Sequence, residues 1–193
     1  MNRIKFLLIS MITLSTISMA EIKVAYLAGG CFWCTESDME KVPGVINVIS
    51  GYSGGHVENP TYDQVSSGVT GHIESIEVKY DSDKINYSQL LHSFLKGIDP
   101  TDGDGQFVDR GYQYSPAIFY QNINEENLAK EALKQIYEEG HFTDIKVKLL
   151  PFTKFYAAEE YHQDYYYKNP IRYKYYRYRS GRDQFLEKVW GKN

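Results

Sequence analysis

The sequence Gly-Gly-Cys-Phe-Trp-Cys-Thr-Glu at residues 29–36 decides how the rest of the chain is organised. It follows an apolar run at residues 24–28 that predicts a strand, and it leads into residues 35–41, which have the composition of a helix. A strand, a glycine turn and a helix place Cys31 at the helix start, where unpaired N–H groups and the helix dipole favour an anion. A thiol in that position has a lowered pKa, and its thiolate is a nucleophile. We therefore predict that Cys31 is a nucleophile.

Both cysteines of the chain lie in this stretch, as the pair Cys31 and Cys34. A disulfide between them would close so short a loop that it would remove little entropy from the unfolded chain, so its structural value would be small. A zinc site needs further ligands, and the five histidines show no paired spacing, so we expect no metal. The Cys-x-x-Cys spacing instead favours a redox-active pair.

The first twenty residues have the parts of a secretory signal peptide. Arg3 and Lys5 are positive, residues 6–17 are apolar, and residues 18–20 form a small-x-small cleavage site. A membrane anchor is the alternative, but the apolar run is shorter than the roughly 20 residues that a spanning helix needs. We expect residues 21–193 to be a secreted, periplasmic domain without stable membrane insertion.

Periodicity and turn residues predict the remaining elements. Strands are predicted at residues 44–50, 72–80, 115–120 and 145–150, and helices at residues 87–98, 125–139 and 157–168. This order predicts one α+β domain, a two-layer sandwich in which helices pack on a mostly antiparallel mixed sheet with a ferredoxin-like split βαβ core. We expect the C-terminal segment to wrap over this domain.

Residues 72–80 alternate polar and apolar side chains, but the phase of the alternation changes near Ser75. A bulge at Ser75 would turn Glu74 toward the protein interior. The alternative is that Glu74 is one more solvated acid on an exposed face, and the alternation alone fits both.

Residues 168–182 contain six basic residues and no acid, interleaved with tyrosines. Such a pattern can bind single-stranded nucleic acid, but the chain after residue 20 carries 19 basic and 25 acidic residues, a net charge of −6. That balance argues against nucleic-acid binding. We expect the tyrosine rings to pack on the domain with the basic groups in water, and a docking surface for an acidic partner is the alternative.

Six separated motifs occur in one order along residues 21 to about 170. They are Gly30-Cys31-Phe32-Trp33, Gly51-Tyr52-x-Gly54-Gly55, Asn59-Pro60-Thr61-Tyr62, Gly71-His72-x-Glu74, Asp109-x-Gly111-x-Gln113-Tyr114 and Ala158-Glu159-x-Tyr161-His162-Gln163. Through them the chain resembles the peptide methionine sulfoxide reductases of the A type. The resemblance implies an enzyme that reduces methionine-S-sulfoxide, both in proteins and as the free amino acid.

The same resemblance implies roles for single residues. The Cys31 thiolate attacks the sulfoxide sulfur, Glu74 gives a proton to the sulfoxide oxygen, and Cys31 becomes a sulfenic acid. To act as an acid near pH 7, Glu74 needs a pKa raised by a largely buried site. Tyr62 and Tyr114 match the tyrosines that hydrogen-bond the sulfoxide oxygen.

The remaining matched residues shape the pocket. Asp109 corresponds to an acid that supports the site, and Phe32 and Trp33 would wall an apolar pocket for the S-methyl group. Plain core packing is the alternative for both aromatics. Val108 and Tyr112 depart from the family pattern and concern only the detail of the pocket.

Many members of the family recycle through a cysteine in a C-terminal tail, and this chain has no cysteine after Cys34. We therefore predict that Cys34 attacks the sulfenic acid and forms a Cys31–Cys34 disulfide, which a thioredoxin-like protein reduces. Alternatively, an external thiol resolves Cys31 directly. No cofactor is expected beyond this electron donor, and a monomer is expected. The rival functions are a general thiol-disulfide oxidoreductase and a binding module that uses the tyrosine-rich tail.

Overall fold

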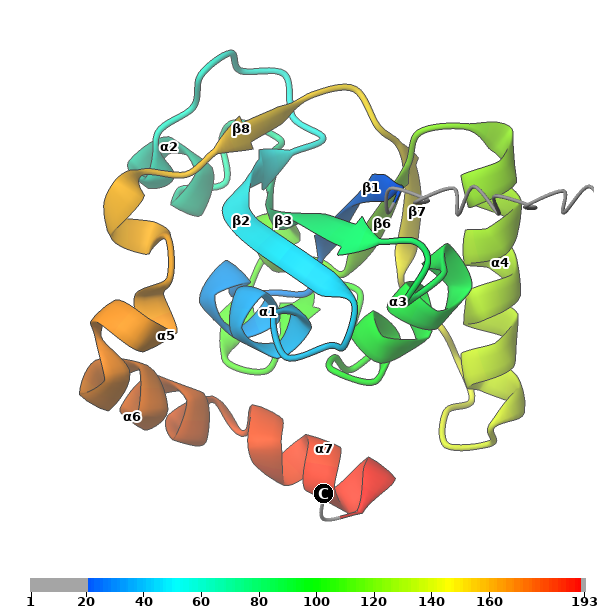
Figure 1. Ribbon diagram of the computed structural model, residues 1–193. Coiled ribbons are helices and arrows are strands. Elements are labelled where there is room, and N and C mark those ends of the chain that lie inside the picture. Colours follow the sequence, from blue (N-terminus) through cyan, green and yellow to red (C-terminus); the bar gives the residue numbers. More distant parts are fainter. Residues whose placement is uncertain (1–20, 192–193) are drawn as a thin grey trace, which may run out of the picture.

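The computed structural model describes residues 21–191, in which a curled β-sheet carries helices on its surface (Figure 1). The signal peptide predicted at residues 1–20 lies outside the described residues and stays a prediction. In the described part of the chain, no helix is both long and apolar enough to cross a membrane.

Six strands of the described region form the main sheet, in the order β7-β6-β1-β3-β2-β8. Their bounds are β1 (Ile22–Ala28), β2 (Val45–Ser53), β3 (Ile73–Asp81), β6 (Ala117–Tyr120), β7 (Lys148–Pro151) and β8 (Phe155–Ala157). Neighbouring strands are antiparallel except β6 and β7, which are parallel. The order β6-β1-β3-β2 is that of a ferredoxin-like split βαβ core, so the predicted α+β fold is confirmed.

Helices and short elements join these strands. They are α1 (Phe32–Met39), α2 (Tyr62–Ser66), α3 (Tyr87–Leu95), α4 (Ile123–Glu138), α5 (Tyr165–Lys168), α6 (Pro170–Ser180) and α7 (Arg182–Trp190), with a small β4 (Gly105–Gln106) and β5 (Asp109–Arg110) hairpin and the 3₁₀ turns η1 (Tyr112–Tyr114) and η2 (Glu160–His162). Leu90, Leu91 and Phe94 of α3 are fully buried in the main core. Such side chains each contribute roughly 1.5–3 kcal/mol on burial.

The bulge predicted at Ser75 is absent from the described sheet. Strands β2 and β3 pair without interruption from Ser53–Ile73 to Ser50–Ile76, and their one irregularity lies between Val45 and Asn47. The phase changes because both faces of β3 are covered here: Ile76 packs in the main core and Ile73 in a second cluster on the other face. Glu74 lies on the same face as Ile76, since alternate residues of a strand share a face.

The single helix predicted at residues 157–168 is wrong, and only its end is an α-helix, as α5. Ala157 instead ends β8, which pairs with Gly51 at the edge of the sheet, and η2 follows after a break. Asp164 then adopts a left-handed φ of 52°, which separates η2 from α5. The sheet edge therefore offers this segment backbone partners that helical periodicity does not reveal.

The C-terminal helices α5, α6 and α7 run along the side of the domain that carries α1 (Figure 1). The inward face of α6 holds Tyr173, Tyr176, Arg177 and Ser180, the i, i+3, i+4, i+7 spacing of a packed helix. The C-terminal segment wraps over the domain as expected, but two of its basic side chains are largely buried and not in water. The Arg177 side chain is 14% exposed, and Arg182 is 2% exposed.

Candidate active site

The N-terminus of α1 holds both cysteines in fixed positions. Cys31 is the N-cap residue, and its carbonyl oxygen accepts hydrogen bonds from the N–H groups of Cys34 (3.1 Å) and Thr35 (3.3 Å). The turn before it needs glycine, because Gly30 has a φ of +80° and a Cβ there would lie 2.4 Å from the Gln106 side chain. The strand–turn–helix geometry predicted for this stretch is confirmed.

A cavity of about 80 Å³ opens beside Cys31, which gives room for several water-sized groups. It is lined by Cys31, Phe32, Trp33, Tyr62, Glu74, Asp109, Tyr114 and Tyr176. These residues come from α1, α2, β3, β5, η1 and α6, so the fold brings together six segments that are distant in sequence. Of the residues predicted for the site, only Cys34 does not line this cavity.

Glu74 is buried in the cavity wall and 2% exposed. Its Oε2 accepts a hydrogen bond from the Phe32 N–H at 3.0 Å, so the carboxyl group faces the first turn of α1. Burial raises the pKa of Glu74 to about 8, and the nearby charge of Asp109 adds to the rise. The carboxyl group is therefore mostly protonated at pH 7, which is the state that a proton donor requires.

Tyr62 and Tyr114 present phenol groups to the same cavity. Burial raises the pKa of Tyr62 to about 12, and burial likewise raises the pKa of Tyr114 above its ordinary value. Both hydroxyl groups thus keep their protons and are able to donate hydrogen bonds to a bound oxygen. The backbone N–H of Tyr62 donates to Glu159 Oε1 (2.8 Å), which ties α2 to the segment before η2.

Comparisons with known proteins decide the family. The family model described as "Peptide methionine sulfoxide reductase" matches residues 23–193. This chain belongs to that family. Methionine sulfoxide reductase MsrA/MsrB of Vibrio cholerae is 58% identical over 173 residues, which cover 89% of this chain and 46% of the relative. MsrA of Bacillus licheniformis is 49% identical over 171 residues, 88% of this chain and 94% of the relative.

Solved structures agree with the family. Reduced Mxr1 of Saccharomyces cerevisiae is 30% identical, with a TM-score of 0.72 over 77% of this chain and 86% of Mxr1. Mxr1 in complex with Trx2 shares the fold at 22% identity and a TM-score of 0.52, over 80% of this chain and 91% of the solved chain. The chain is an A-type, thiol-dependent methionine sulfoxide reductase, and it spans less than half of the Vibrio relative.

The pKa of the Cys31 thiol differs from the expectation drawn from the sequence. Burial raises the pKa of Cys31 well above its ordinary value, so the predicted lowering is wrong for the closed site. Hydrogen bonding from Cys31 lowers the pKa of Cys34, and the cationic Arg182 and Arg177 lower it further. The prediction considered the helix N-terminus, but it did not foresee that the C-terminal helices bury both sulfurs.

Phe32 and Trp33 each have one face in the cavity and another in the packing around it. Phe32 is 1% exposed and belongs to the main core, so it both packs and lines the cavity. The Trp33 indole N–H donates to His162 Nδ1 at 3.1 Å, and its ring stacks on Tyr165 with centroids 3.7 Å apart. The sequence showed His162 only as part of a motif, and its hydrogen bond to Trp33 was not predicted.

Tyr176 is the cavity residue that sequence reasoning missed. Its hydroxyl donates to Asp109 Oδ2 and its ring meets Trp33 edge-on. The inward spacing of α6 was visible in the sequence, but the tail was treated as a cover rather than as part of the site. The Val108 side chain is 54% exposed and Tyr112 47% exposed, and neither lines the cavity.

A group of three acids lies close to the site but has structural partners. Glu36, Glu40 and Asp164 place one oxygen each within 4.8 Å of the others. Glu36 is fully buried and accepts from the Ser50 hydroxyl and the Asp164 N–H, and burial raises its pKa to about 7. Glu40 accepts from the Tyr166 hydroxyl. The hydrogen bonds that Glu36 and Glu40 accept from Asp164 and Tyr166 thus connect α1 to the start of the C-terminal helices.

Proposed function

We propose that this reductase acts on methionine-S-sulfoxide, in oxidised proteins and as the free amino acid, with Cys31 as nucleophile and Glu74 as proton donor. The observation that carries the proposal is the cavity, which sets the Cys31 side chain beside a buried carboxyl group that is protonated at neutral pH. Acid catalysis by a positioned group contributes typically 10²–10⁴-fold to a rate. Repair of oxidised proteins follows from this reaction.

In the first step Cys31 gives its proton to the hydrogen-bonded Cys34 thiolate and its sulfur bonds to the sulfoxide sulfur, while the Glu74 proton passes to the sulfoxide oxygen. The oxygen then moves to the Cys31 sulfur as the S–O bond of the substrate and the S–S bond between substrate and Cys31 break, so methionine leaves and Cys31 is a sulfenic acid. The sulfoxide is thus reduced by two electrons and Cys31 is oxidised by two. Glu74 ends the step as a carboxylate and regains a proton from water.

The other cavity residues support this step. Tyr62 and Tyr114 donate hydrogen bonds to the oxygen as its negative charge grows, the stabilisation that most helps a polar transition state. The Phe32 and Trp33 rings form the apolar wall for the S-methyl group.

Cys34 resolves the intermediate. It lies three residues after Cys31 in the first turn of α1, is 1% exposed, and has a lowered pKa, which supplies a thiolate. Attack of the Cys34 sulfur on the sulfenic sulfur forms the Cys31–Cys34 disulfide, and the displaced hydroxide leaves as water with the proton that Cys34 received from Cys31.

A thioredoxin-like dithiol protein then reduces the disulfide and restores both thiols. The complex of Mxr1 with Trx2 supports this choice of partner. Secretion through the signal peptide at residues 1–20, a periplasmic location, a monomeric state and independence of any cofactor are part of the same proposal.

Replacing Glu74 by Gln tests the proposal against the rival thiol-disulfide oxidoreductase. Glutamine keeps the size of the side chain but has no acidic proton, so single-turnover methionine release should fall roughly 100-fold or more. Exchange of the reduced pair with a small disulfide needs no proton donor at this site and should stay close to the wild-type rate. Parallel loss of both reactions, or loss of neither, would contradict the role given to Glu74.

A further inference from the structure

Helix α6 reaches the reductase site through Tyr176 alone. The hydroxyl of this residue donates to Asp109 Oδ2, and its ring lines the cavity together with Cys31 and Glu74. No other residue of the described C-terminal helices, 165–190, lines that cavity. The hydrogen bond spans 67 residues of sequence, so it forms only when α6 is docked.

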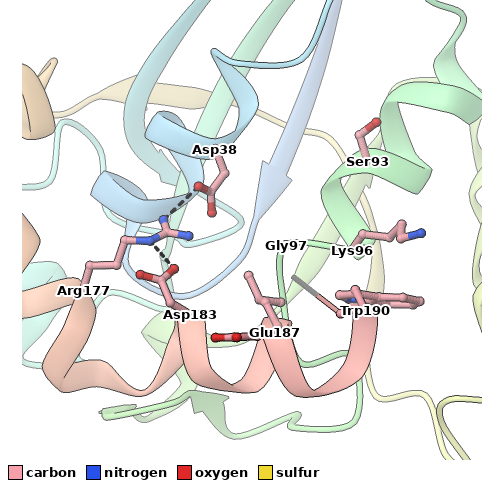
Figure 2. Close-up of a pocket in the computed structure, with 10 residues that line it drawn as sticks. Asp38, Ser93, Lys96, Gly97, Arg177, Asp183, Glu187 and Trp190 are labelled. Atoms are coloured by element: carbon pink, nitrogen blue, oxygen red, sulfur yellow. Dashed lines mark hydrogen bonds and ion pairs between the residues drawn. The ribbon is translucent and has the colours of Figure 1, made fainter. Parts of the chain in front are cut away.

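The position of Tyr176 is fixed by the residue next to it. Arg177 donates to Asp38 Oδ1 of α1 at 2.8 Å and to Asp183 Oδ1 of α7 at 2.7 Å, and Figure 2 shows its guanidinium between the two carboxylates. The Arg177 side chain is 14% exposed, so both ion pairs are largely shielded from water. A charge-assisted pair on each side restricts the rotation and sliding of α6. Tyr176 is therefore held in place from outside the cavity.

We propose that Tyr176 is a positioning residue of the reductase, which orients the Asp109 carboxylate beside Glu74 and closes the cavity over Cys31. The proposal rests on the function proposed above. Without the phenol, Asp109 would be half-buried with no hydrogen bond to hold its Oδ2. Because removal of one partner leaves a desolvated carboxylate, it would turn toward water or take up a proton.

Either response of Asp109 weakens the proton donor. The negative charge of Asp109 raises the pKa of Glu74. If Asp109 loses that charge or moves away, the pKa of Glu74 falls and less of Glu74 is protonated at neutral pH. The other titratable or charged groups that act on this pair come from each packed element: Cys31 and Cys34 of α1, Tyr62 of α2, Tyr114 of η1 and Arg182 of α7. None of these is changed by removing one hydroxyl from α6.

The test compares Tyr176→Phe with Tyr178→Phe in the full chain, using methionine-S-sulfoxide and dithiothreitol. Tyr178 lies on the same helix but is 68% exposed, so its hydroxyl is the matched control. We expect Y176F to lower kcat/KM about tenfold, as loss of one hydrogen bond to a charged group does. We also expect the basic limb of its pH profile to move to lower pH, whereas Y178F should match the wild type.

A double variant separates positioning from loosening of α6. If Tyr176 acts through Asp109, adding Y176F to an Asp109→Asn background costs little further activity, because coupled residues are not additive. If Y176F only loosens the helix, its loss is the same in both backgrounds and the proposal is overturned. Wild-type activity and pH profile in Y176F would overturn it as well. Absence of methionine release from the wild type would instead refute the proposed function.

Discussion

Glu74 illustrates, at the scale of one residue, how burial alone prepares a carboxyl group to act as an acid. Its backbone is ordinary strand, and its one hydrogen bond, from Phe32 N–H, favours the charged form. Desolvation outweighs that bond and raises the pKa to about 8. The alternation of residues 72–80 fits both a buried and a solvated Glu74, and only the family resemblance implied the largely buried one.

The pH dependence of the first step follows from this pKa. Methionine release in a single turnover should fall as pH rises through about 8, where Glu74 loses its proton. The stability of the folded chain should also fall as pH rises. In the unfolded chain Glu74 ionises near pH 4.3, whereas in the folded chain it keeps its proton up to about pH 8. Glu74 therefore lowers the free energy of unfolding progressively between about pH 4.3 and pH 8. Stopped-flow measurement of methionine release from pH 6 to 9.5 follows this decline, and its absence in E74Q would assign it to Glu74 and not to Cys31.

Replacing Cys34 by Ser isolates the nucleophile from the resolving thiol. The variant should still release one methionine per chain, because Cys31 and Glu74 remain in the cavity. It should then stop as the sulfenic acid, which intact-mass measurement detects as one added oxygen. Turnover with a thioredoxin should be lost. Full turnover with that reductant in C34S would show that an external thiol resolves Cys31 directly.

At the scale of elements, the seam between α1 and the C-terminal helices controls access to the thiols. Figure 2 shows the outer part of this seam, where Arg177 of α6 joins Asp38 of α1 to Asp183 of α7. Inside it, Cys34 packs against Tyr173. A reductant that attacks the Cys34 sulfur needs α6 to move away from α1, since Cys34 is 1% exposed and packs against Tyr173.

Breaking the seam should therefore release α6 from α1 and expose the Cys34 sulfur. Arg177→Gln leaves Asp38 without its main partner, and we expect alkylation of Cys34 by a maleimide to speed up about tenfold, or about 1.4 kcal/mol in the opening equilibrium. Arg179→Gln is the matched control, because Arg179 is exposed on the same helix. Equal alkylation rates in R177Q and the wild type would show that α6 does not limit access.

Local patterns predicted some elements well and others poorly. The apolar spacing of residues 87–98 and the strand–turn–helix at Cys31 needed only short-range rules, and both are present. The single helix predicted at residues 157–168 does not form, because Ala157 pairs with β2 and the left-handed backbone of Asp164 interrupts the segment. The bulge predicted at Ser75 is wrong. The apolar pattern of β3 changes phase there because the second cluster, around Phe119, buries the other face of the strand. Tyr176 was missed because its partner, Asp109, is remote in sequence.

At the scale of the whole molecule, the fold sets six segments around one thiol. The ferredoxin-like core supplies Glu74 and the α1 turn. The short elements α2, β5 and η1 supply Tyr62, Asp109 and Tyr114, and α6 supplies Tyr176. The order of motifs along the chain predicted the first two sources through family resemblance. Helix α6 also helps to bury Cys31, which explains why its pKa is raised rather than lowered as at an open helix terminus.

A single-turnover experiment on the pre-reduced protein tests the central claim most directly. Methionine-S-sulfoxide is added without reductant, and released methionine and remaining thiols are counted per chain. We predict about one methionine with loss of both thiols, because Cys34 converts the sulfenic acid to a disulfide. No methionine, with both thiols still titratable, would contradict the claim that Cys31 and Glu74 form a methionine sulfoxide reductase site.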